Sequence, residues 1–162
     1  MNAAGLPPLV SELKKTPISL ARLLDGLTPG DLAWKPSASE FSILENVWHL
    51  RDIEEEGYLV RVRRLRAEPH PVLPDIDGDR LAAERRYNEQ PLQPGYEGFA
   101  RARRLATEAV ADATDQDLAR PGTLEKTGPV TLGSILEMMR EHDADHLGAV
   151  RSLRERILEG RP

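Results

Sequence analysis

Ser42-Ile43-Leu44-Glu45-Asn46-Val47-Trp48-His49-Leu50 is the stretch with the clearest helix start in the chain. Its first four residues form a capping-box pattern, in which the Ser side chain accepts a hydrogen bond from a free backbone N–H and the Glu side chain bonds back to the first residue. Apolar residues then recur at helical spacing through Val62 and Leu65, and the pattern ends before Pro69. The stretch therefore predicts a helix over residues 42–68.

Apolar residues recur every three or four positions on both sides of this segment, which predicts further helices near residues 8–27, 95–113 and 131–158. Thr131 is a candidate N-cap for the last of them. Pro17 lies inside the first and predicts a break or kink near Thr16. Aromatic residues are few and β-branched runs are short, so strands have little to form from. The sequence predicts an all-α fold.

A faint internal repeat relates the two halves of the chain. Residues 28–33 match residues 114–119 at a Thr, an Asp, a Leu and an Ala, and each copy follows one predicted helix and precedes another. The pattern indicates two helical hairpins of related design. Between them, residues 70–95 are rich in Pro, Asp and Gly, with a candidate short helix over residues 81–88. A connection this long predicts a crossover that makes the second and third helices parallel.

Composition narrows the class of protein. A chain of 162 residues predicts a single domain over residues 1–162. Without cysteine, the chain has no disulfide, thiolate nucleophile or cysteine-ligated metal. It shows no signal peptide and no apolar run of roughly 18 residues, so we expect a cytoplasmic protein that does not enter a membrane. The net charge is −5, and Glu54-Glu55-Glu56 offsets the basic run Arg61–Arg66, so nucleic acid is not an expected partner.

Two histidines stand four residues apart in Glu141-His142-Asp143-Ala144-Asp145-His146. On a helix they project from one face, about 6 Å apart, and they fall within the apolar stripe. Burying two imidazoles without partners is costly. We interpret the pair as ligands of one metal ion; the alternative is a buried pair satisfied by Asp or backbone groups. The pentapeptide also resembles the H-E-x-x-H zinc-protease signature, but Asp143 is one methylene shorter than the Glu of that motif.

A third ligand is needed to complete such a site, and the chain offers two further histidines. His49 lies on a predicted helix, off the centre of its apolar stripe. His70 lies between Pro69 and Pro71, in a stretch expected to be extended. A helical His is the better-ordered scaffold for a ligand, so His49 is the preferred candidate.

The residues from Phe41 to Glu54 resemble the DinB-like signature W-S-x-x-E-x-x-x-H-L-x-D-x-E, with Phe41 in place of the usual Trp. The segment His142–Leu147 resembles the H-D-x-x-H-L element of the same family. The resemblance implies a four-helix bundle in up-down-down-up order, with a long crossover between helices 2 and 3. It also implies a site for a divalent transition metal, Ni²⁺ or Zn²⁺, on His49, His142 and His146.

DinB-like proteins include metal-dependent transferases that use low-molecular-weight thiols. The resemblance therefore predicts a metal-dependent enzyme with a small-molecule substrate: a thiol S-transferase, or a related transferase or hydrolase. Three imidazoles leave open metal positions, as in catalytic sites. Glu45, Asp52 and Glu56, near His49, are candidates to orient that ring or act as a base. The alternative is a non-catalytic metal-binding or stress-related interaction bundle. A homodimer is left open.

Overall fold

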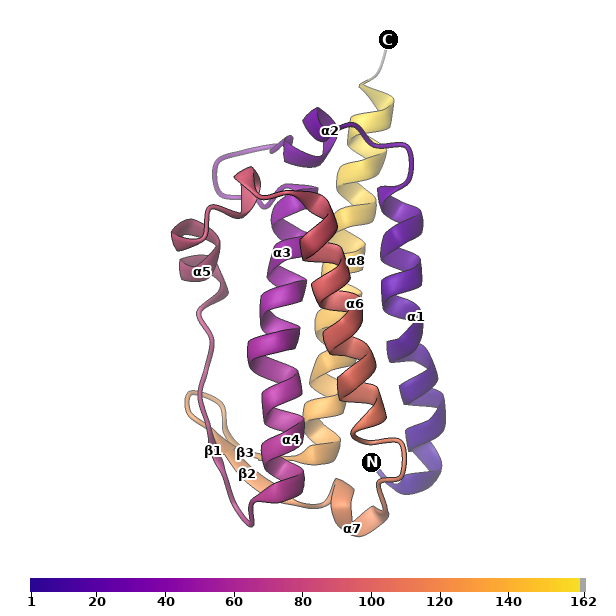
Figure 1. Ribbon diagram of the computed structural model, residues 1–162, viewed down its shortest axis with the longest axis vertical. Helices are drawn as coiled ribbons and strands as arrows, with labels where there is room; N and C mark the ends of the chain where they lie inside the picture. The colour runs from indigo at the N-terminus through magenta and orange to yellow at the C-terminus, as the bar shows by residue number, and fades with distance from the viewer. Residues whose placement is uncertain (161–162) are drawn as a thin grey trace.

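The computed structural model describes residues 1–160, and most of them are helical. Four long helical columns lie lengthwise side by side (Figure 1). These columns are α1 (Leu6–Leu24), α3 (Ile43–Asp52) with its continuation, α6 (Leu92–Glu108) and α8 (Leu132–Glu159). The column that begins with α3 passes through a π-helical segment, η2 (Ile53–Tyr58), into α4 (Leu59–Ala67). The prediction of a mostly helical bundle is confirmed.

The predicted helix starts at Ser42 and Thr131 are confirmed by their hydrogen bonds. Ser42 Oγ accepts from the N–H of Glu45 at 3.0 Å, and the Glu45 carboxylate accepts from the N–H of Ser42 at 2.8 Å. Thr131 Oγ1 accepts from the N–H of Ser134 at 3.1 Å. These bonds satisfy backbone donors that have no partner within a helix, and they place the beginnings of α3 and α8.

Of the break or kink predicted near Thr16, the break is wrong, because α1 runs without interruption through Pro17. Proline has no N–H to donate to the carbonyl four residues earlier, which here belongs to Leu13. That carbonyl instead accepts a hydrogen bond from Arg103 Nη1 at 3.0 Å. A side chain from α6 therefore replaces the missing backbone bond, and this partner cannot be identified from local sequence.

The two copies of the faint repeat have the same local structure. Residues 28 and 114 are both Thr N-caps of short helices, α2 (Pro29–Ala33) and α7 (Asp115–Leu118). Asp31 and Asp117 complete a capping box in each. The matched residues of the repeat are thus the ones that form the turn between two long helices in each half.

A small three-stranded sheet at one end of the bundle was not predicted. It consists of β1 (Val72–Leu73), β2 (Pro121–Leu124) and β3 (Gly128–Thr131), in the order β1-β2-β3. β1 is parallel to β2, and β2 is antiparallel to β3. Strands this short give almost no alternation to read in a sequence. The structure also shortens the third predicted helix, since α6 ends at residue 108 rather than 113.

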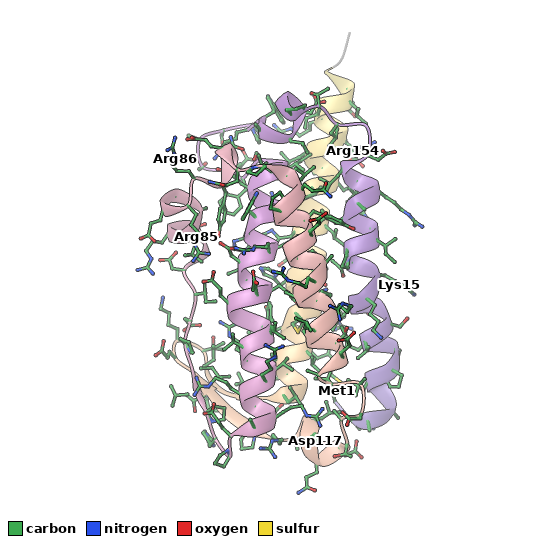
Figure 2. The ribbon with its side chains drawn as sticks, viewed as in Figure 1. Met1, Lys15, Arg85, Arg86, Asp117 and Arg154 are labelled. Atoms are coloured by element: carbon green, nitrogen blue, oxygen red, sulfur yellow. The ribbon has the colours of Figure 1, made fainter. Side chains whose placement is uncertain are left out.

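The segment between α4 and α6 packs along the outside of α3 (Figure 1). It carries α5 (Gly78–Glu84) and the 3-10 turn η3 (Tyr87–Glu89), which divide the predicted helix over residues 81–88. Arg85 extends from this segment toward α3 (Figure 2) and contacts Asp52 and Glu56 at 2.5 Å each. Tyr87 Oη donates to Asp52 at 2.5 Å. We call residues 74–90 the outer arm.

A buried charged cluster joins the four columns at mid-height. Arg103 of α6 is 1% exposed and contacts Glu54 of η2 at 2.8 Å and Asp143 of α8 at 2.5 Å. Thr16 of α1 donates to Asp143 at 2.6 Å. Burial raises the pKa of Glu54, against the opposing effect of Arg103. Burial alone would lower the pKa of Arg103. The negative charges and hydrogen bonds of Glu54 and Asp143 outweigh this effect, so the pKa of Arg103 is raised.

Among residues 1–160, no helix combines the length and apolar character needed to cross a bilayer.

Candidate metal centre

Three histidines from two helices converge beside this charged cluster. His49 comes from α3, and His142 and His146 lie one turn apart on α8. One ring nitrogen of each lies within 4.8 Å of the other two. Nε2 of His49 is 3.1 Å from Nε2 of His142. The helical spacing predicted for the α8 pair thus places both rings next to the His49 ring.

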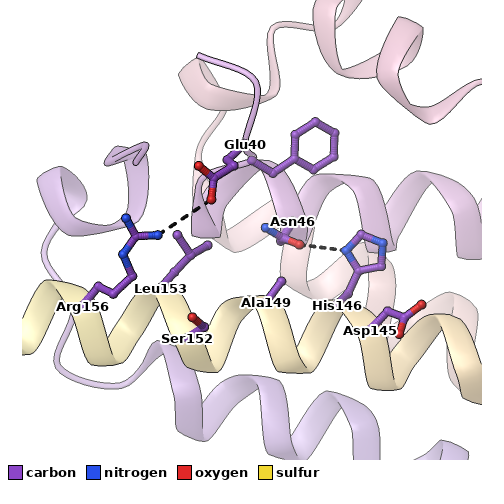
Figure 3. Close-up of a pocket in the computed structure, with 9 residues that line it drawn as sticks. Glu40, Asn46, Asp145, His146, Ala149, Ser152, Leu153 and Arg156 are labelled. Carbon is purple, nitrogen blue, oxygen red and sulfur yellow. Dashed lines mark hydrogen bonds and ion pairs between the residues drawn. The ribbon is translucent and has the colours of Figure 1, made fainter. Parts of the chain in front are cut away.

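Asn46 fixes the orientation of the His146 ring. Oδ1 of Asn46 lies 2.7 Å from Nδ1 of His146 (Figure 3). The amide nitrogen of Asn46 donates to the carbonyl of Ser42 at 2.8 Å, which identifies Oδ1 as the acceptor toward the ring. Nδ1 of His146 therefore carries the proton, and Nε2 keeps its lone pair. This is the support that metal-ligating histidines receive from neighbouring groups.

The outer arm closes the site on the His49 side. α5 begins at Gly78, against the His49 ring, and a Cβ atom at that position would lie 2.3 Å from Cε1 of the ring. Only a residue without a side chain allows this approach. Phe41 stands on another side, with its ring centre 5.6 Å from that of His49. Nδ1 of His49 is buried and has no hydrogen-bond partner in the described chain.

The three imidazoles are held in their neutral form. Burial, with smaller effects from His146, lowers the pKa of His49 to about 4. Burial and the two neighbouring histidines lower the pKa of His142 to about 2. Burial also lowers the pKa of His146. A neutral imidazole is the form that binds a metal, so the rings are ready for a ligand role at neutral pH.

The geometry fits a single divalent ion. Two nitrogen atoms each about 2.1 Å from one ion, at octahedral to tetrahedral angles, are about 3.0–3.4 Å apart. The 3.1 Å between His49 and His142 lies in this range. In the absence of an ion, the same separation lets one neutral ring donate an N–H···N hydrogen bond to the other.

The remaining predicted candidates lie away from this convergence or are already engaged. His70 is exposed and its Nε2 is 3.1 Å from Oγ1 of Thr123 in the sheet. Glu45 serves the Ser42 cap and pairs with Lys35 at 2.8 Å. Asp52 and Glu56 are paired with Arg85 of the outer arm.

Asp143 does not fit the protease-like alternative. Its carboxylate is buried and accepts hydrogen bonds from Arg103 and Thr16, so it is engaged in the charged cluster. The Glu of an H-E-x-x-H site acts as a base at the metal. This chain therefore shares only the spacing of the two histidines with that motif.

A pocket of about 380 Å³ opens beside His146 (Figure 3). Asp145, an exposed carboxylate next to that ligand candidate, lies on its wall together with Phe41 and Asn46. The sequence analysis did not single out Asp145, and its position next to His146 is the only signal in the sequence that could have done so. The remaining wall comes from Glu40, Ala149, Ser152, Leu153 and Arg156.

Comparisons with known proteins agree with this fold. YfiT from Bacillus subtilis, described as a probable metal-dependent hydrolase with an unusual four-helix bundle topology, is structurally similar, with a TM-score of 0.88. The alignment covers 96% of this chain and 89% of YfiT at 17% sequence identity. No curated protein matches the sequence significantly. Residues 12–150 match the DinB superfamily. The chain belongs to the DinB superfamily.

Proposed function

We propose that the protein is a metal-dependent enzyme whose His49, His142 and His146 bind one divalent transition metal, Ni²⁺ or Zn²⁺. The observation that carries the proposal is the convergence of three neutral imidazoles beside an open pocket. The description of YfiT as a probable metal-dependent hydrolase supports the same class of activity.

A bound ion of this kind acts as a Lewis acid and lowers the pKa of a coordinated water or thiol. The residues of the chain supply the remaining functions. Asn46 holds the His146 ring, the outer arm packs against His49 through Gly78, and Asp145 is placed to accept a proton at the edge of the pocket. Attack by water would give a hydrolase, and attack by a low-molecular-weight thiol would give an S-transferase. Both require a small-molecule substrate, which a pocket of this size accommodates.

The rival function is a non-catalytic metal-binding bundle. The open pocket favours the enzyme, because an ion held only for structure needs no accessible space beside it.

We also propose that the chain forms one domain with up-down-down-up helix order, in which the outer arm belongs to the crossover between helices 2 and 3. The path of the ribbon in Figure 1 supports this order.

Metal analysis of protein purified without an affinity tag tests the proposal. We expect about one equivalent of nickel or zinc in the wild type and loss of that ion in His49→Ala, His142→Ala and His146→Ala. His70→Ala is the matched control and should keep the ion. Equal metal content in wild type and all four variants would refute the site. If the site is confirmed, two activities would be compared in the metal-loaded wild type and in His142→Ala: hydrolysis of activated esters, and transfer of a thiol to electrophiles.

A further inference from the structure

Arg61 of α4 is a buried cation that has no ion pair among the described residues. Its side chain is enclosed, since the residue is 7% exposed. Nη2 donates to the carbonyl of Pro74 at 3.2 Å, whereas the buried Nε has no partner. Asp75 acts on Arg61 only through its charge, and its carboxylate accepts from the backbone N–H of Lys126. The guanidinium has therefore lost hydration without gaining a bound anion, which is costly.

This cation lies on the His142 side of the three histidines. The central carbon of Arg61 is 5.4 Å from the centre of the Tyr58 ring, and that ring centre is 5.7 Å from the centre of the His142 ring. Tyr58 Oη donates to the carbonyl of Met138, one helical turn before His142. The pocket described above instead extends along α8 past His146. The histidines thus have an open pocket on one flank and an unpaired cation on the other.

The π-helical segment η2 and Gly57 give Arg61 this position. Arg61 follows His49 by twelve residues, and the π-turn between them accommodates about one of these as an insertion. The other eleven make about three helical turns, so both side chains leave the column on about the same face. Helical side chains lean toward the N-terminus, and a Cβ atom on Gly57 would lie 3.7 Å from Nη1 of Arg61. Gly57 therefore leaves room for the guanidinium to lie back toward the histidines.

We propose that the substrate carries a carboxylate and that Arg61 binds this group on the His142 side of the metal site. The inference rests on the proposed function, because it places the reacting group at the three histidines. Nη1 makes no hydrogen bond in the described chain and is not fully buried, so it remains available to a ligand oxygen. One guanidinium balances one negative charge, which favours a carboxylate over a dianionic phosphate. Arg61 is thus a specificity-determining residue for the proposed reaction.

Hydroxamates that differ only at their far end provide the test, since the hydroxamate group chelates a bound ion. Their affinities for zinc-loaded protein would be measured by calorimetry over a series of chain lengths, with methyl, carboxylate and ammonium ends. At one of these lengths, we expect the carboxylate probe to bind about tenfold tighter than the methyl probe, as for a hydrogen bond to a charged group.

Variants separate a direct contact with Arg61 from general electrostatics. Arg61→Met should abolish the carboxylate preference and leave the affinity for the methyl probe unchanged. Arg61→Lys should keep part of the preference, because the positive charge remains. Arg63→Met, which changes an exposed Arg on the same helix, is the matched control and should keep all of it. Without hydroxamate, Arg61→Met should melt at the wild-type Tm or above, because it removes a buried cation that has no ion pair.

Two results would overturn the inference while leaving the metal site intact. One is equal binding of the carboxylate and methyl probes at every length, or tighter binding of the ammonium probe. The other is weaker binding of both probes by Arg61→Met together with a lower Tm, since Arg61 would then act by holding the outer arm through Pro74. If no hydroxamate binds the zinc-loaded protein, the proposed function itself fails, and this inference fails with it.

Discussion

Gly78 and His49 are in contact in a way that no other residue at position 78 would permit. A Cβ atom on Gly78 would lie 2.3 Å from Cε1 and 2.7 Å from Nδ1 of the His49 ring. The atom it would meet belongs to a ring packed between α5, Phe41 and the α8 histidines. The ring has little space to move, so a side chain at position 78 must displace either α5 or the proposed ligand.

We therefore expect Gly78→Ala to weaken zinc binding by about tenfold, the scale on which groups around a metal site act. The measurement is a competition titration against a zinc chelator, with circular dichroism to check the helix content. Gly30→Ala is the control, because its nearest neighbouring atom is 3.8 Å from the new Cβ. Identical zinc affinity in wild type and Gly78→Ala would show that α5 does not position His49.

Metal should stabilise the fold through the three histidines. An ion that binds only the folded state at 100–1,000 times its Kd raises the free energy of unfolding by roughly 3–4 kcal/mol. His142→Ala should lose most of the increase in Tm on adding nickel or zinc, and His70→Ala should keep it. Thermal melts with excess metal and with chelator measure both. A metal-induced shift of the same size in His142→Ala would place the stabilising ion elsewhere.

The metal-free protein should lose stability in acid in a defined window. The pKa of His49 is about 4 and that of His142 about 2 in the folded state, against an ordinary 6.5. Between about pH 6.5 and pH 4 the unfolded chain takes up protons that the folded chain refuses, so the free energy of unfolding falls as pH falls. Urea titrations across this range should show a steep dependence in wild type and a flatter one in His142→Gln. Equal slopes would mean that His142 titrates normally.

Those lowered pKa values also set the pH range of metal binding. Protons displace the ion only when they bind to the histidines of the folded protein. The pKa of His49 is about 4, so His49 takes up its proton near pH 4. The stabilisation by added zinc should therefore persist at pH 5.5 and disappear toward pH 4. Loss of the effect already at pH 6 would contradict the pKa directions given by burial.

Arg103 should be among the most sensitive positions in the chain. Arg103→Met leaves Glu54 and Asp143 buried without their cation and frees the Leu13 carbonyl. We expect a loss of about 3–5 kcal/mol in the free energy of unfolding. Arg104→Met removes only an exposed pair with Glu108 and should cost under about 0.5 kcal/mol. Urea denaturation of both variants measures the two losses in the free energy of unfolding. Losses of similar size would mean that the buried charged cluster contributes little to stability.

The features of this structure that depend on residues close together in the sequence could be predicted from the sequence. The caps at Ser42 and Thr131 depend on residues three positions apart, and the His142–His146 spacing depends on one helical turn. Each of these relationships lies within one element, so propensity and spacing were sufficient. The approach of His49 to that pair depends on how α3 packs against α8. The sequence favoured His49 only as the helical alternative to His70, and the family resemblance pointed to the same residue.

Features that depend on contacts between distant segments could not be predicted from spacing. Arg103 bonds to the Leu13 carbonyl across 90 positions, and this bond allows α1 to continue through Pro17. β1 pairs with β2 through Val72 and Thr123, in strands too short to show a pattern. Gly78 lies in the predicted crossover, before the helix expected over residues 81–88, and nothing local indicates that a ring would lie against it.

The π-helical segment Ile53–Tyr58 has a consequence for how this column can vary in length. A π-turn holds about one residue more than an α-turn, which makes it equivalent to a single insertion into a regular helix. On a continuous wheel with about 100° per residue, the buried pair Val47 and Leu50 of α3 is centred about 60° from the buried pair Val62 and Leu65 of α4. Deleting one residue between Glu54 and Tyr58 should restore a regular helix and keep both faces in place. Deleting a second should rotate α4 and expose Val62 and Leu65 to solvent. Relatives with an unbroken α-helix at this point should align with a one-residue gap.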